Sequence, residues 1–469
     1  MAFSSVQFLF VFLPLSLAVY WLCPKWLRNA VLAAFSLLFF AWAGLKGAAI
    51  LVLLAGINWL GGLSLGRLAH KRPLLILLIL LDLAVLGGFK YAGFAAETVN
   101  ALVPGLLPVL SPALPLGLSF YVFTAIGYCA DVAAGKVESE KNPIRFAVFL
   151  AFFGHGPSGP IVRYGQQAPQ LDPGSETRRV SADRFCYGIK RLVLGLAKKA
   201  IIADQLALIY AKVASVPAAT LPAPILVLGY TAYMMQLYFD FSGYSDMAIG
   251  LGLCFGFHFK ENFNYPYISA SIQEFWRRWH ISLGAWFRDY LYIPLGGSHV
   301  KPVRWIFNIF LVWMATGFWH GAAWNFILWG LMYAVLLLIE KIWLLPYLKK
   351  HKIIGHLYVL FFVLIGFVLF NASSVADFWD CIVSMFGGGQ IKPVTTENLY
   401  YLKSYAVIIL TAVIGATPLP ARLYGRLQKK KGLKQTLDIA EILLLVMLLL
   451  LCVAFLVDGS FNPFLYFRF

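Results

Sequence analysis

Charged residues are scarce in this chain: Asp, Glu, Lys and Arg make up 13% of its 469 residues. Soluble domains carry about 25% charged residues, so this composition excludes a water-soluble enzyme and a disordered chain. Hydrophobic residues reach 61%, and apolar runs such as 6–22, 30–45 and 442–457 contain no charge that could cover a soluble surface. The composition therefore predicts a polytopic membrane protein.

Acidic residues are the scarcer charged type, with 21 Asp and Glu against 38 Lys and Arg and a formal net charge of +17. In a membrane protein this excess indicates orientation rather than nucleic-acid binding, because basic residues collect in cytoplasmic loops. The six cysteines form no CxxC pair, so we expect small core residues without disulfides or a metal. No basic residue precedes the first apolar run, which predicts a retained first span rather than a signal peptide.

Long apolar segments recur along the whole chain, and a span needs about 20 such residues. The stretch 146–162 is apolar but interrupted by glycine and proline, which predicts a re-entrant segment. We expect an all-α polytopic transmembrane bundle of about 11–13 membrane segments, with re-entrant and interfacial helices, in one membrane domain over 1–469. The candidate spans are 6–22, 29–45, 47–66, 74–94, 115–133, 192–213, 222–256 (long enough to break in two), 303–319, 321–345, 353–371, 403–419 and 437–457.

The distribution of Lys and Arg predicts the orientation of these spans. Basic residues gather in 25–28, 67–72, 136–145 and 422–434, whereas 95–114 contains no Lys or Arg. The positive-inside rule places the basic loops in the cytoplasm and both termini outside. The aromatic tail 458–469 is then expected on the outer face.

His320 is the sharpest candidate for chemistry. Between Arg304 and Glu340 the chain has no Asp, Glu, Lys or Arg, and His320 is the only histidine there. One straight helix over that stretch would be about 50 Å long, more than the roughly 30 Å apolar core of a bilayer. We therefore expect a break near Gly317 and Gly321, with His320 lining a cavity. An imidazole suits a general base or a nucleophile; the alternative is a histidine hydrogen-bonded between helices.

The segment 268–297 predicts a helix with two different sides. Aromatic and aliphatic residues recur at helical spacing, and a narrow polar stripe lies beside them. Two arginines and a histidine in that stripe suit a phosphate-bearing or acyl-carrying ligand; the alternative is an interfacial helix whose arginines meet lipid phosphates. The stripe consists of Gln273, Arg277, His280, Gly284 and Arg288.

Two aspartates interrupt the apolar segment 222–256. Asp240 and Asp246 would face different sides of one helix, so we expect separate partners, such as arginines of a neighbouring helix. A structural ion pair is the preferred role for them. His155 lies in the re-entrant stretch and is either a hinge contact or a site residue.

Seven further motifs are distinctive, namely Gln236–Gly250, Glu261–Asn264, Pro266–Ser269, Glu274–Leu283, Arg288–Gly297, Phe318–Gly321 and Asn462–Phe469. Together they resemble the membrane-bound O-acyltransferase (MBOAT) family, in particular its bacterial polysaccharide O-acetylation branch. Segment 158–161, Ser-Gly-Pro-Ile, is similar instead to the membrane protein of teichoic-acid D-alanylation.

The resemblance implies a helical fold around a tunnel and two catalytic histidines, His320 and His280. It also implies transfer of an acetyl group from a cytoplasmic donor, acetyl-CoA, across the bacterial inner membrane to an extracytoplasmic polysaccharide such as alginate. A periplasmic SGNH or esterase-like partner is expected, with no permanently bound cofactor, metal or nucleic acid. The candidate substrate-binding residues are Arg277, Arg278, Trp279, Arg288, Trp319, Asp240, Ser242, Tyr244 and Asn308.

Other functions remain open on the sequence. Within the acyltransferases the alternatives are peptidoglycan O-acetylation and teichoic-acid-type D-alanyl transfer. A covalent acyl-histidine is the alternative to direct transfer with His320 as general base. A polysaccharide or acyl transporter without chemistry would call for inverted repeats and midplane charges.

Overall fold

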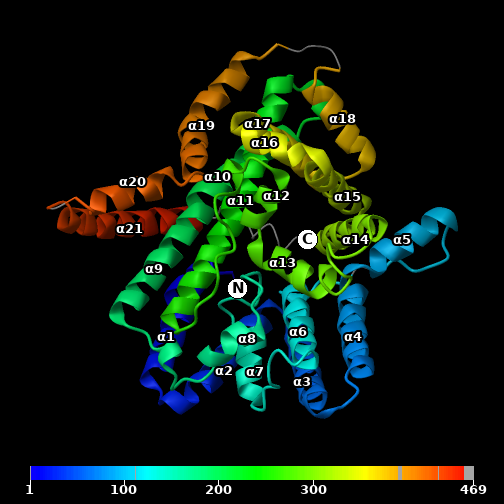
Figure 1. Ribbon diagram of the computed structural model, residues 1–469. Coiled ribbons are helices and arrows are strands. Elements are labelled where there is room, and N and C mark those ends of the chain that lie inside the picture. Colours follow the sequence, from blue (N-terminus) through cyan, green and yellow to red (C-terminus); the bar gives the residue numbers. More distant parts are fainter. Residues whose placement is uncertain (1, 111, 389–392, 431, 459–469) are drawn as a thin grey trace. The chain divides into compact units, whose positions relative to one another are not determined.

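The computed structural model describes residues 2–110, 112–388, 393–430 and 432–458, and every regular element in those ranges is helical (Figure 1). The all-α prediction is therefore confirmed. Contacts between residues divide the chain into two compact units. The first comprises Met1–Leu192, Ser245–Glu261 and Ala285–Pro294, and the second comprises Val193–Tyr244, Asn262–Gly284 and Leu295–Phe469. This division by contacts does not test whether 1–469 is one membrane domain, which stays a prediction.

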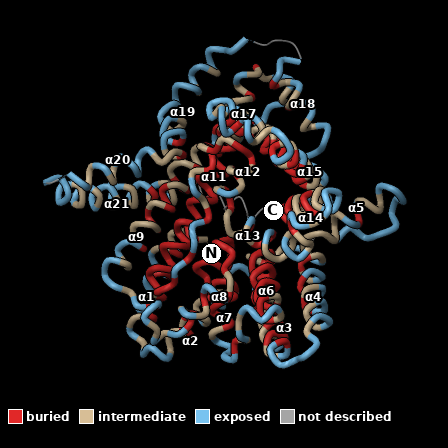
Figure 2. Tube along the Cα trace, in the orientation of Figure 1, coloured by how far each residue is buried: buried red, intermediate tan, exposed pale blue. Residues whose placement is uncertain are grey.

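In the first unit, α6 is the central helix, because it packs against α3 and α4 and is buried along most of its length (Figure 2). Helix α2 packs against α1, α3 and α7. The helices of this unit are η1 (Phe8–Phe12), α1 (Leu13–Leu22), η2 (Lys25–Leu27), α2 (Arg28–Ala43), α3 (Leu45–Arg67), α4 (Arg72–Lys90), α5 (Ala92–Leu102), α6 (Leu118–Ala133), α7 (Pro143–Ala151), α8 (Tyr164–Gln167), η3 (Ala168–Gln170) and η4 (Glu176–Arg178). Helix α9 (Ala182–Ala197) continues into the second unit, and η8 (Arg288–Tyr292) belongs to the first.

In the second unit, α14 and α15 form an antiparallel pair, with α12 and α17 packed on α15. The helices here are η5 (Lys198–Ala203), α10 (Asp204–Ala214), η6 (Ala218–Thr220), η7 (Pro266–Ile268), α12 (Ile272–Arg278), α14 (Pro302–His320), α15 (Trp324–Ile339), η9 (Glu340–Leu344), α16 (Leu345–Lys350), α17 (Lys352–Asn371), α18 (Val375–Met385), α19 (Thr396–Gly415), α20 (Leu419–Gln428) and α21 (Lys434–Val457). Helices α11 (Ala223–Cys254) and α13 (Ile281–Phe287) have residues in both units.

Seven described helices are long and apolar enough to cross a membrane. They are 25–43, 45–67, 72–90, 324–350, 352–371, 396–415 and 434–457, and each overlaps a span expected from the sequence. Two shorter apolar helices, 8–22 and 118–133, overlap two more. The higher number of crossings stays a prediction, as does the tunnel.

Some boundaries differ from the expectation. The segment 222–256 does not break in two, since α11 runs unbroken from Ala223 to Cys254. The re-entrant stretch is helical only as α7, which ends at Ala151, and 152–162 is irregular and buried. Buried irregular backbone of this kind is tolerated at membrane depth because protein surrounds it.

Two glycines allow α14 and α15 to approach each other closely. A Cβ on Gly317 would lie 2.2 Å from the Phe326 carbonyl oxygen, and one on Gly330 would lie 2.2 Å from that of Trp313. The expected helix break near Gly317 is therefore wrong, because α14 continues to His320 and Gly317 serves packing. The expected break at Gly321 is confirmed, since α15 begins only at Trp324.

Gly330→Ala is expected to lower stability by about 1–3 kcal/mol, because its methyl group would push α15 away from the Trp313 carbonyl. Thermal unfolding of the detergent-purified protein measures the effect. Gly56→Ala in α3 is the matched control, since a Cβ there meets nothing within 4 Å. Equal unfolding temperatures for Gly330→Ala and Gly56→Ala would contradict the close packing of α14 and α15.

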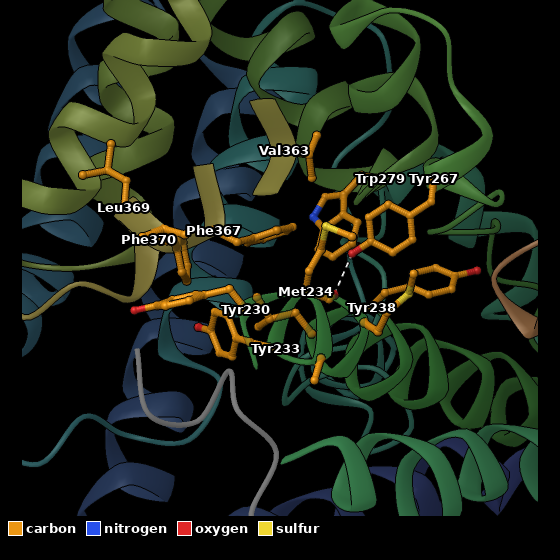
Figure 3. Packing of buried hydrophobic residues seen from close by; sticks show 14 of the residues in the cluster. Tyr230, Tyr233, Met234, Tyr238, Tyr267, Trp279, Val363, Phe367, Leu369 and Phe370 are labelled. Carbon is orange, nitrogen blue, oxygen red and sulfur yellow. Dashed lines mark hydrogen bonds between the residues drawn. The ribbon is translucent and has the colours of Figure 1, made fainter. Parts of the chain in front are cut away.

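An aromatic core lies within the second unit (Figure 3). Tyr267, on η7, donates a 2.6 Å hydrogen bond from its hydroxyl to the Met234 carbonyl oxygen of α11. Trp279 stacks on Phe275 with ring centroids 5.6 Å apart and contacts Phe367 at 5.5 Å. The Tyr267 hydrogen bond attaches η7 to α11, and the Phe367 contact attaches Trp279, the residue before His280, to α17.

Candidate active site

His320 is the last residue of α14 and is buried, with 4% of its surface exposed. The chain leaves the helix at Gly321 in an extended conformation and turns into α15. Three aromatic rings surround the imidazole: Trp319 at 4.9 Å, Trp329 at 5.1 Å and Phe370 at 5.4 Å between centroids. The helix end therefore holds the histidine among aromatic side chains of α14, α15 and α17.

His280 lies at a break between α12 and α13 and is also buried. Its φ of +46° is in the left-handed region, which costs a non-glycine residue about 1–2 kcal/mol. Two backbone hydrogen bonds to the preceding loop support this conformation: Asn264 N donates to Arg278 O at 2.9 Å, and Ile281 N donates to Asn262 O at 3.0 Å. Strain held by surrounding contacts is typical of functional sites.

The expected continuous helix over 268–297, with its polar stripe, is wrong. Arg277 is on α12, His280 is in the break, and Arg288 is in the π-helix η8. The backbone of Trp279 is extended and its ring packs in the aromatic core. The residues after Trp279 therefore do not continue the helical spacing of α12. A helical wheel assumes one uninterrupted helix, so the stripe does not exist in the fold.

Asn262 orients His280. Its Oδ1 accepts hydrogen bonds from Ser282 N at 3.1 Å and Ser282 Oγ at 2.9 Å, and lies 3.2 Å from Nδ1 of His280. When Nδ1 carries the proton and donates to this oxygen, Nε2 keeps its lone pair. Burial lowers the pKa of His280, so its imidazole is neutral at neutral pH.

On the expectation that the protein transfers acyl groups and that His280 is catalytic, Asn262→Ala should lower the reaction rate by about 10²-fold, because a small displacement of a catalytic group costs that much. Initial rates with the purified protein measure the effect. Asn264→Ala is the control, because its exposed side chain can be removed while its backbone hydrogen bond to Arg278 remains. Equal rates for the two variants would show that the orientation of His280 does not matter.

Trp319 lies beside both histidines. Its ring centroid is 4.9 Å from that of His320 and 6.0 Å from that of His280. The histidine of α14 and the histidine of the α12–α13 break therefore meet at one buried indole. The structure thus brings together three of the residues singled out from the sequence.

The other candidate residues occupy several environments. Arg277 is exposed, whereas Arg278 forms a 2.9 Å ion pair between its Nη2 and Glu274 Oε1. Asn308 is buried on α14, and its Nδ2 donates to the carbonyl oxygens of Leu295 and Gly297 at 3.2 Å. Its Oδ1 has no partner in the described part of the second unit.

Ser242 and Tyr244 are buried on α11. The Ser242 hydroxyl has no hydrogen-bond partner among the described residues. Arg288 belongs to the first unit, where its Nε lies 2.6 Å from Asp289 Oδ1. Burial raises the pKa of Asp289, but hydrogen bonds from Arg288 and Arg163 outweigh it and hold that pKa below its usual value.

Asp240 belongs to a buried charge cluster with Lys199 and Asp204. Lys199 Nζ lies 2.7 Å from Asp240 Oδ1 and 2.8 Å from Asp204 Oδ1. Lys199 and Asp204 face the same way because η5 is a π-helix, in which residues five apart align. Gly243 allows α11 to lie close to the backbone of α9, since a Cβ at residue 243 would lie 2.7 Å from the carbonyl oxygen of Gly195.

The expectation that the two aspartates have separate partners is confirmed, although Asp240 pairs with a lysine rather than an arginine. Asp246, in the first unit, lies 2.5 Å from Nη2 of Arg191, which also binds Glu261 at 2.6 Å. His155 is buried in the irregular segment, with its ring 5.1 Å from that of Phe259.

The sequence reasoning did not single out Asn262, Lys199 and Trp329 as site residues. Lys199 and Asp204 lie in the expected span 192–213, and two charges of opposite sign in one apolar stretch could have indicated an internal ion pair. Asn262 and Trp329 carried no such signal, because their contacts join segments far apart in the chain.

Comparisons with known proteins identify the family of the chain. A model of the MBOAT, membrane-bound O-acyltransferase, family matches residues 118–376, which include both histidines. The chain is 37% identical to the probable alginate O-acetylase AlgI of Azotobacter vinelandii over 100% of both chains. It is 32% identical to the peptidoglycan O-acetyltransferase of Helicobacter pylori, over 82% of this chain and 80% of that one. It is also 32% identical to the teichoic acid D-alanyltransferase of Bacillus subtilis, over 61% and 78% respectively.

The protein is a multi-pass membrane enzyme of the acyltransferase class. It belongs to the membrane-bound O-acyltransferase family, in the branch that contains the alginate-type O-acetylases.

Proposed function

We propose that this enzyme transfers an acetyl group from acetyl-CoA on the cytoplasmic side of the inner membrane to an extracytoplasmic polysaccharide of the alginate type. The observation that carries the chemistry is the convergence of His320 and His280 on the buried Trp319. The similarity to the alginate O-acetylase of Azotobacter vinelandii over its whole length supports the acceptor class.

In this proposal His320 is the general base. Its neutral imidazole takes the proton from the acceptor hydroxyl while that oxygen attacks the thioester carbonyl carbon. The tetrahedral intermediate then collapses: the carbon–sulfur bond breaks, and the thiolate takes the proton back from the imidazolium. His280, held by Asn262, orients a reactant across Trp319. A covalent acyl-histidine is the competing route.

Trp329 is the proposed oxyanion donor. Its ring lies 5.1 Å from that of His320, and its buried Nε1 has no hydrogen-bond partner among the described residues. Burying a hydrogen-bond donor without an acceptor costs about 1–3 kcal/mol of folding free energy. A reaction intermediate that brings an acceptor to this N–H is therefore stabilised. A developing oxyanion is such an acceptor.

The acceptor is delivered outside the membrane. A hydroxyl of the glycan itself, or a serine of an SGNH or esterase-like periplasmic partner, would receive the acetyl group. The outer-face tail 458–469 belongs to this part of the proposal and, apart from Asp458, lies outside the described residues. The lipid bilayer and the acyl donor complete the set of partners.

The deciding experiment uses the purified protein in liposomes with ¹⁴C-acetyl-CoA and an unacetylated alginate oligosaccharide. Label in the oligosaccharide, dependent on the protein, is the expected result. Transport of acetyl-CoA or glycan without any ester formation would instead support a transporter. D-alanyl transfer with no acetyl transfer would favour the teichoic-acid-type alternative, which segment 158–161 and the similarity to the Bacillus subtilis enzyme support.

A further inference from the structure

Two arginines meet in the first unit far from the two histidines in the sequence. Arg28 is the first residue of α2, and Arg178 is the last residue of η4. Both guanidinium groups lie over the ring of Tyr20, at 5.1 Å for Arg28 and 5.8 Å for Arg178. Arg28 also lies 4.7 Å from the Trp21 ring, and Arg178 lies 4.4 Å from the Phe257 ring. We call this cluster the Arg28–Arg178 site.

The site contains buried donors without acceptors. Trp21 Nε1, Arg28 Nε, and Nε and Nη2 of Arg178 have no hydrogen-bond partner in the part of the chain that the structure describes. Arg178 as a whole is only 3% exposed. Its Nη1 donates to Asn29 Oδ1 at 2.5 Å and to Leu171 O at 3.3 Å, and the Tyr20 side chain also interacts with the guanidinium. The oxygens that meet Arg178 among the described residues are therefore neutral.

The positive charges of the site are not neutralised by an ion pair among the described residues. Asp172 interacts electrostatically with Arg178 without forming an ion pair with it. The ion pair of Asp172 is with Arg145, whose Nη2 lies 3.7 Å from Asp172 Oδ1. Burial lowers the pKa of Arg178, yet arginine keeps its charge at neutral pH. A buried, unpaired guanidinium is costly, because desolvation of a charge is repaid only by a partner of opposite sign.

The place of the site in the fold indicates where its ligand comes from. Tyr20 and Trp21 end α1, Arg28 begins α2, and these are the dark blue helices of Figure 1. Leu27, the N-cap of α2, offers no side-chain acceptor to the first amides of that helix. Helix ends of apolar spans lie at the membrane–water interface, where Trp, Tyr and Arg meet lipid headgroups.

We propose that the Arg28–Arg178 site binds a phosphate group at the membrane–water interface, either the phosphodiester of an anionic phospholipid or a soluble phosphate ester. Two guanidinium groups and an indole N–H match the oxygens of a phosphate, which arginine binds with planar, charge-assisted hydrogen bonds. The site belongs to the first unit and contains neither histidine, since His280 and His320 both belong to the second unit.

The test compares Arg178→Gln and Arg28→Gln with Arg179→Gln, using the full-length purified protein. Arg179 is the matched control, because it is adjacent in sequence and its side chain is 77% exposed. In the lipid arm, native mass spectrometry measures retention of titrated phosphatidylglycerol. In the soluble arm, inorganic phosphate and coenzyme A are titrated while the unfolding temperature is recorded.

We expect one arm to show binding that is weakened about tenfold or more in both site variants and is unchanged in Arg179→Gln. The arm in which this happens identifies the source of the phosphate. If Arg178→Gln does not fold, Arg28→Gln carries the comparison, because Arg28 is only half-buried. Equal binding by Arg28→Gln, Arg179→Gln and the unmodified protein in both arms would overturn the proposal and leave the cluster a structural cation–π contact.

Discussion

Replacing His320 with alanine is expected to lower the rate of acyl transfer by about 10²–10⁴-fold, because the loss of a general base, the role proposed for His320, usually has an effect of that size. The protein should still insert and fold, because His320 is the last residue of α14 and alanine continues a helix well. The measurement is the initial rate of acetyl transfer by the purified protein, with thermal unfolding recorded on the same sample.

The control for this variant is His299→Ala, which removes an exposed histidine of the same unit. Unchanged transfer by His320→Ala would remove His320 from the mechanism. Native mass spectrometry at neutral pH, directly after mixing with the acyl donor, separates the two routes that use His320: an acyl-histidine adds the mass of the acyl group to the protein, whereas general-base catalysis leaves its mass unchanged.

Replacing Lys199 with methionine is expected to destabilise the protein by about 3–5 kcal/mol, because it leaves Asp204 and Asp240 as uncompensated buried carboxylates. Methionine keeps most of the volume of lysine, so loss of charge rather than of packing is the cause. The measurement is thermal unfolding in detergent. Lys349→Met on α16 is the matched control, since that lysine is exposed.

A second substitution tests whether unpaired charge causes this loss of stability. Adding Asp240→Asn to Lys199→Met should recover part of the lost stability, since one of the two unpaired carboxylates is then neutral. A double variant no more stable than Lys199→Met would mean that the cluster is not held by charge. A single variant that unfolds at the same temperature as Lys349→Met would contradict the buried ion pairs altogether.

The helical-wheel interpretation of 268–297 failed for a local reason that the sequence conceals. Nothing in Arg278-Trp279-His280-Ile281 is a helix breaker by propensity, since no glycine or proline is present. The break exists because Asn262 and Asn264 hydrogen-bond to the chain on either side of it and Trp279 packs into the aromatic core. Tertiary contacts therefore overrode a pattern that was periodic in the sequence.

The sequence by itself determined the class of protein, its helical fold and the positions of most of its long apolar helices, whereas the catalytic role of His320 stays a prediction. These features follow from composition and from local hydrophobic patterns, which the chain carries whatever its partners are. Only the tertiary structure decided that His280 sits at a strained break, that it meets His320 at Trp319, and that Lys199 neutralises Asp240. Those facts depend on contacts between segments far apart in the chain. Helical periodicity has no information about such contacts, because it describes one element at a time.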